Sequence, residues 1–115
     1  MIEEKYLALQ TTAQELRREA ALLARQIGSI DIQLAPVIER ERMIRGAIQS
    51  THGGAASFNP RRSAERKPMF EALLQISVDH GATKNLRRDL DSRMRAYRRE
   101  AKTIETLLDK ERSKK

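Results

Sequence analysis

The feature that most constrains the fold is a long heptad repeat of apolar residues in the first half of the chain. From Ile2 to Ile48, apolar or aromatic side chains recur at alternating steps of three and four residues, with Glu41 as the exception. A repeat of this length is typical of a coiled-coil helix, and it predicts a helical arm over residues 2–49. Its central positions are Tyr6, Leu9, Ala13, Leu16, Ala20, Leu23, Ile27, Ile30, Leu34, Val37 and Ile44.

A second repeat predicts another helical arm over residues 68–112. Pro68 suits a first helical turn, because its ring fixes φ and that position needs no amide hydrogen. The repeat is apolar near both ends, but His80, Thr83 and Arg87 interrupt its middle. Its apolar positions are Met69, Leu73, Ile76, Leu90, Met94, Tyr97, Ala101, Ile104 and Leu108.

Glycine and proline mark the places where either arm is expected to bend or break. Gly28 and Pro36 leave two alternatives for the first arm, which are a kinked but continuous helix and two consecutive helices. The heptad phase passes both residues without a slip, which favours the continuous helix. In the second arm, Gly81 follows two polar residues, so a continuous helix and a break near residues 79–81 are both open.

Between the arms, residues 50–67 have no apolar periodicity and concentrate Gly, Ser, Asn and Pro. Such a composition predicts a loop. Loops longer than about 12–15 residues tend to be functional or disordered, and one aromatic residue with four bases suits an arm that orders on a partner. The four bases are Arg61, Arg62, Arg66 and Lys67.

Two arms of similar length joined by a loop predict an all-α antiparallel helical hairpin as a single domain over residues 1–115, with a frayed tail at 113–115. Aromatic residues make up only 3% of the chain, which suits a narrow helical seam better than a globular core. A lone hairpin has little interior, so we expect it to oligomerise into a helical bundle, with a dimer as the leading assembly. The expected oligomerisation seam is Leu9, Leu16, Leu23, Ile27, Ile30, Leu34, Val37, Ile44, Leu73, Ile76, Leu90, Met94, Tyr97, Ile104 and Leu108.

The formal net charge of +7 is distributed unevenly. Residues 1–50 carry seven bases and seven acids, whereas residues 69–115 carry twelve bases and eight acids. Arg88, Arg95 and Lys102 are seven residues apart and therefore share an outward face, which Lys84 and Arg99 flank. This pattern predicts an acidic partner, either nucleic acid or protein, although a solvated face that keeps a coiled coil soluble explains it as well.

Other classes of site find little support. The chain has no cysteine, and its two histidines, His52 and His80, lie in different segments without a second ligand at suitable spacing. Carboxylates are scattered along both arms rather than gathered for acid–base chemistry. We therefore expect no catalysis, no metal and no cofactor. No stretch approaches the ~20 apolar residues that span a bilayer, so we expect a cytoplasmic protein without membrane contact.

Two functions remain as hypotheses from sequence. The first is a coiled-coil assembly or adaptor protein, which binds itself and a partner protein of a larger complex. The alternative is a basic accessory protein, of the kind that phages and plasmids encode, which binds duplex DNA or RNA through the second arm and the loop.

Overall fold

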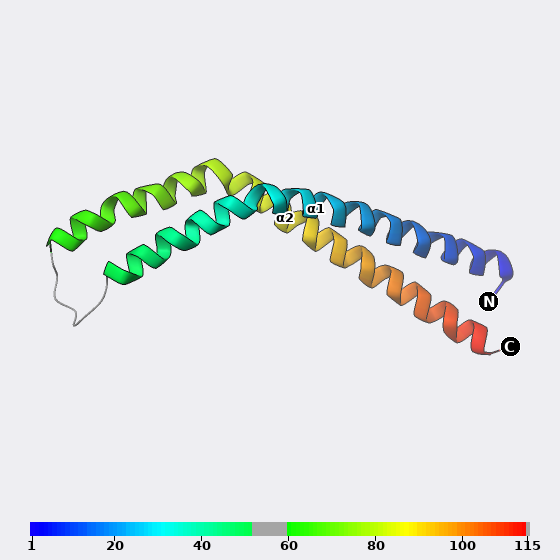
Figure 1. Ribbon diagram of the computed structural model, residues 1–115. Coiled ribbons are helices and arrows are strands. Elements are labelled where there is room, and N and C mark those ends of the chain that lie inside the picture. The colour runs from blue at the N-terminus through cyan, green and yellow to red at the C-terminus, as the bar shows by residue number, and fades with distance from the viewer. Residues whose placement is uncertain (52–59, 115) are drawn as a thin grey trace. The chain divides into compact units, whose positions relative to one another are not determined.

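The computed structural model describes residues 1–51 and 60–114, which form two α-helices and no β-strand. Helix α1 spans Glu3–Thr51 and helix α2 spans Pro60–Ser113. The two helices pack against each other as an antiparallel hairpin (Figure 1). This architecture confirms the all-α hairpin that the two heptad repeats predict.

The second helix begins eight residues earlier than the sequence predicts. Residues 60–67 belong to α2, so assigning them to a loop was wrong, while residues 52–59 lie outside the described residues. Pro60 occupies the first helical position, where its missing amide costs nothing, and Ala64, Glu65 and Lys67 are good helix formers. Pro68, predicted to start the helix, instead lies inside it.

Neither glycine nor proline interrupts the arms. Helix α1 continues through Gly28 and Pro36, and α2 continues through Gly81, so the continuous alternative is confirmed in both arms. At Pro36 the helix lacks one amide donor, but Leu34, two residues earlier, is only 2% exposed and is held in the interior. Burial of the apolar stripe on both sides therefore outweighs the local preference to break.

The interior of the hairpin is the predicted seam. All fifteen residues expected to form an oligomerisation seam are buried or half-buried within one chain. In α1 the most buried positions are separated by seven residues or by a multiple of seven, as expected for a coiled coil. The buried apolar residues are Ala13, Ala20, Ile27, Leu34, Ile48, Ile76, Leu90, Met94, Ala101 and Leu108.

The hairpin divides into two compact units, which we describe separately. The terminal unit contains Met1–Ser29 and Leu86–Lys115, and the loop unit contains Ile30–Asn85. In Figure 1 the blue part of α1 lies beside the orange and red part of α2 in the terminal unit. Seven of the ten buried apolar residues belong to the terminal unit, and only Leu34, Ile48 and Ile76 belong to the loop unit.

Candidate interaction surfaces

A half-buried ion pair lies in the loop unit at the one position where the α1 repeat is not apolar. The Glu41 side chain is 15% exposed and pairs with Lys84 of α2, while Arg45 lies 3.6 Å away on the solvent side of the same carboxylate. Satisfied in this way, the carboxylate is tolerated at a seam position. Lys84 is therefore turned towards α1, and its expected role in partner binding is not supported by its position.

The other predicted bases of the second arm lie on the outer face of α2 in the terminal unit. At 3.6 residues per turn, five bases fall within an arc of about 80° that is opposite the seam. Sequence analysis missed one of them, Lys110, because it does not follow the heptad spacing of the others. We call this surface the basic strip, and it comprises Arg88, Arg95, Arg99, Lys102 and Lys110, all exposed.

The environment of the basic strip leaves most of its charge uncompensated. Arg95 pairs with Asp91 at 3.0 Å, yet its side chain remains 73% exposed. The structure gives Arg88, Arg99 and Lys102 no ion pair with any described residue. Two open depressions lie along the strip and have Arg99 in common; their lining also includes Ser92, Arg98, Thr103, Thr106, Leu107 and Lys110.

The four bases of the predicted loop fall at the start of α2, in the loop unit. Arg66 is half-buried and Lys67 is exposed. The side chains of Arg61 and Arg62 lie outside the described residues. These four bases therefore belong to a different unit from the basic strip.

A second surface, in the loop unit, is apolar rather than charged. Phe70, Leu74 and Val78 recur every four residues along α2, and their exposed fractions are 53%, 66% and 70%. Residues at this spacing form one ridge of a helix surface, and we call the three residues the apolar ridge. The heptad repeats did not predict this ridge, although the four-residue spacing of its members is visible in the sequence.

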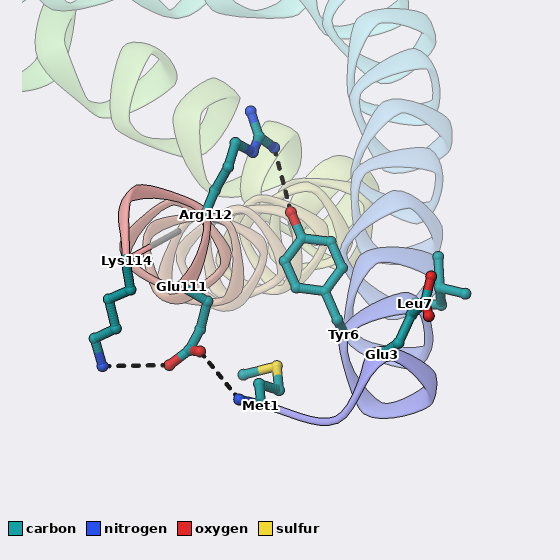
Figure 2. Close-up of a pocket in the computed structure, with 7 residues that line it drawn as sticks. All are labelled: Met1, Glu3, Tyr6, Leu7, Glu111, Arg112 and Lys114. Atoms are coloured by element: carbon teal, nitrogen blue, oxygen red, sulfur yellow. Dashed lines mark hydrogen bonds and ion pairs between the residues drawn. The ribbon is translucent and has the colours of Figure 1, made fainter.

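The beginning of α1 and the end of α2 enclose a pocket, shown in Figure 2. The amino group of Met1 donates a hydrogen bond of 3.3 Å to Oε2 of Glu111, and Arg112 donates one of 3.4 Å to the Tyr6 hydroxyl. The hydrogen bond from the amino group, with the charge of Lys114, lowers the pKa of Glu111 below its ordinary value. These contacts, with the hydrogen bond from Nε of Arg17 to Glu105 at 3.1 Å, join the exposed edges of the two helices in this unit.

The described residues contain no cluster of three or more potential metal ligands. His80, the one histidine among them, is half-buried at a seam position, and His52 lies outside the described residues. Carboxylates are engaged with bases along the helices, as in the pairs Arg42–Glu39 and Arg112–Asp109.

Within the described residues, neither helix has a stretch both long and apolar enough to cross a membrane. No family model, curated protein or solved structure matches the chain.

Proposed function

We propose that the protein is a non-enzymatic assembly protein, which associates with a second copy through the apolar ridge and displays its remaining outer faces to a partner protein of a larger complex. The observation that carries this proposal is the apolar ridge itself. Three consecutive ridge residues, Phe70, Leu74 and Val78, expose more than half of their surface to solvent. Contiguous apolar surface of this kind marks a protein–protein contact.

The distribution of apolar residues in the loop unit supports a partner at this position. This unit buries three apolar side chains deeply but exposes six large ones. Its seam also holds polar residues, including Glu41, His80 and Thr83. A two-helix unit with so little interior gains stability when further apolar surface is covered, and small chains commonly do this by oligomerising.

The geometry of the ridge favours a second copy of this chain as the partner. A ridge of residues four apart packs into the groove beside an identical ridge at a helix crossing angle of about −50°. Ser77 and Gly81 lie beside the ridge on the same face of α2, and a Cβ at Gly81 would meet nothing within 4 Å. These residues add little bulk beside the ridge, so each copy offers both a ridge and space next to it, as a two-fold symmetric interface requires.

Sedimentation across a concentration series tests this proposal. We expect the wild-type protein to form dimers, and we expect a variant with Leu74→Gln and Val78→Gln to remain monomeric, because each polar side chain replaces apolar area in the contact. The matched control is Leu22→Gln with Leu107→Gln, which removes two exposed leucines from the terminal unit. The control should dimerise as the wild type does.

Two results would contradict the proposal. One is a wild-type protein that stays monomeric at every concentration. The other is a control variant that dissociates as readily as the ridge variant, since the contact would then not be specific to the loop unit. Circular dichroism on all three proteins verifies that helicity is retained, as expected because Gln is a good helix former.

A further inference from the structure

The outer face of α2 in the terminal unit concentrates the positive charge of the protein. Residues 86–115 carry eleven of the 23 bases and six of the 16 acids, which gives +5 of the total net charge of +7. Residues 1–29, which complete the terminal unit, carry four bases and four acids and contribute nothing. The charge of this unit therefore belongs to α2 alone.

Within α2 the charge is arranged as a line. The basic strip runs over 22 residues from Arg88 to Lys110, a distance of about 33 Å along the helix axis. Over this length no Asp or Glu falls within its arc, and Asp91 and Asp109 lie at the edge, about 60° from Arg88 around the helix. The strip thus presents cations to solvent over nearly the length of one turn of duplex, which is about 34 Å.

From this arrangement we infer that the basic strip binds the phosphate backbone of duplex nucleic acid. Duplex DNA carries one negative charge per about 1.7 Å of its axis, so binding to it does not require cations at one fixed interval. An acidic helix or peptide would need carboxylates at intervals that match the strip. The uneven steps of seven, four, three and eight residues between successive bases favour the continuous polyanion.

The residues between the bases are consistent with backbone contact. Thr103 and Thr106 donate their hydroxyl protons to the carbonyl oxygens of Arg99 and Lys102, at 2.9 and 2.8 Å, so these hydroxyls are satisfied within the helix. Hydrogen bonds to a ligand would come from the Arg and Lys side chains. The arc contains no Asn or Gln, the side chains that pair with adenine, so we expect little sequence preference.

A membrane surface fits this face less well. A helix that lies in a bilayer interface needs an apolar face next to its bases. Along the strip the intervening residues are Ser92, Thr103 and Thr106, and Leu107 alone lies at its edge. A single leucine does not make the apolar face that such a helix needs.

Fluorescence anisotropy with a labelled 24-base-pair DNA duplex, an RNA duplex of the same sequence, and poly-glutamate tests the inference between 50 and 200 mM NaCl. Because each neutralised phosphate releases counterions, we expect log K to fall with log salt at a slope between about −2.7 and −4.5 for three to five contacts. Both duplexes should bind, and scrambling their sequence should change affinity by less than about threefold.

The decisive variant combines Arg88→Gln, Arg99→Gln and Lys102→Gln. It should weaken duplex binding at least tenfold at 50 mM salt and make the slope shallower by about 2.7, because three contacts are lost. Its matched control combines Lys5→Gln, Arg18→Gln and Arg25→Gln, which removes the same charge from exposed positions on α1. The control should stay within about threefold of the wild type, since its bases lie off the strip.

Three outcomes would overturn the inference. The control variant could weaken duplex binding as much as the strip variant, which would show that affinity depends on net charge and not on the strip. The wild-type protein could show no duplex binding at 50 mM salt. Poly-glutamate could bind as tightly as the duplexes with the same dependence on the strip, which would point to an acidic protein. The double ridge variant, Leu74→Gln with Val78→Gln, should still bind the duplexes, because it keeps the basic strip. A failure of the self-association proposal can therefore be distinguished from a failure of this inference.

Discussion

The terminal unit and the loop unit are built from the same two helices, yet they differ in how many apolar side chains they bury and in which residues lie on the outer face of α2. The terminal unit buries seven apolar side chains and carries a charged outer face, whereas the loop unit buries three and places an ion pair in its seam. Its outer face instead exposes Phe70, Leu74 and Val78. One heptad pattern can therefore hold two helices together, while the positions outside the heptad seam give each unit a different surface.

The largest expected effect concerns the small interior of the loop unit. Replacing Leu34, which is 2% exposed, with Ala should lower the free energy of unfolding by about 2–4 kcal/mol, because the truncation removes buried apolar contacts and leaves a cavity. Ile32→Ala is the control, since Ile32 is 77% exposed and its loss should change stability by less than about 0.5 kcal/mol. Urea denaturation measures both. Equal losses would show that the loop unit has no interior distinct from its surface.

The interior of the terminal unit should respond to enlargement instead. Ala101 is fully buried between the helices, at 0% exposure, and a leucine there should force them apart at a cost of about 1–3 kcal/mol. Ala82→Leu, at an exposed position of the loop unit, should be nearly neutral. Thermal unfolding of the two variants compares them directly. If Ala101→Leu matched the wild type, close packing in the terminal unit would be ruled out.

The ion pair in the loop unit allows the seam to be broken and repaired. Lys84→Met leaves the Glu41 carboxylate in the seam without its partner on α2, so we expect a loss of about 1 kcal/mol. Adding Glu41→Leu restores an apolar seam position, and the double variant should recover or exceed wild-type stability. A double-mutant cycle in urea measures the coupling. A double variant less stable than Lys84→Met alone would mean that the pair, rather than apolar packing, holds this part of the unit.

The smallest expected effect should be equal in the two units. Gly28 in the terminal unit and Gly46 in the loop unit are helical, and a Cβ at either position would meet nothing within 4 Å. Alanine should therefore raise the free energy of unfolding by about 0.5–1 kcal/mol at each site, because glycine has more backbone freedom to lose. Denaturation midpoints report the change. A loss of stability at Gly28 alone would indicate that the terminal unit depends on this glycine.

The heptad repeats were sufficient to predict the two helices and the residues between them. The repeat in α1 also favoured a continuous helix through Gly28 and Pro36 over two helices, because apolar stripe positions continue on both sides. The boundary of α2 was wrong by eight residues. The prediction gave the turn-forming residues between the arms more weight than the helix propensity of residues 60–67. In the structure, Pro60 and the helix formers after it determine where α2 begins.

The candidate surfaces were less predictable, because they depend on which neighbours lie across the hairpin. The heptad pattern placed Arg88, Arg95 and Lys102 on one outward face, and the structure leaves all three exposed. Lys84 was grouped with them, but its distance from Glu41 depends on the register of α1 against α2, which the sequence does not state. Spacing alone could have shown the apolar ridge, because four-residue steps are visible without any pairing.

The most direct test of this account uses the absence of cysteine from the chain, so that one introduced thiol is unique. Leu74 is the middle residue of the apolar ridge, and in a two-fold symmetric contact the middle of the ridge lies near the symmetry axis. The account predicts that Leu74→Cys forms a disulfide-linked dimer under mild oxidation, at concentrations where the wild type associates, and that Leu22→Cys does not. A monomeric Leu74→Cys protein beside an efficiently linked Leu22→Cys protein would contradict the assignment of self-association to the loop unit.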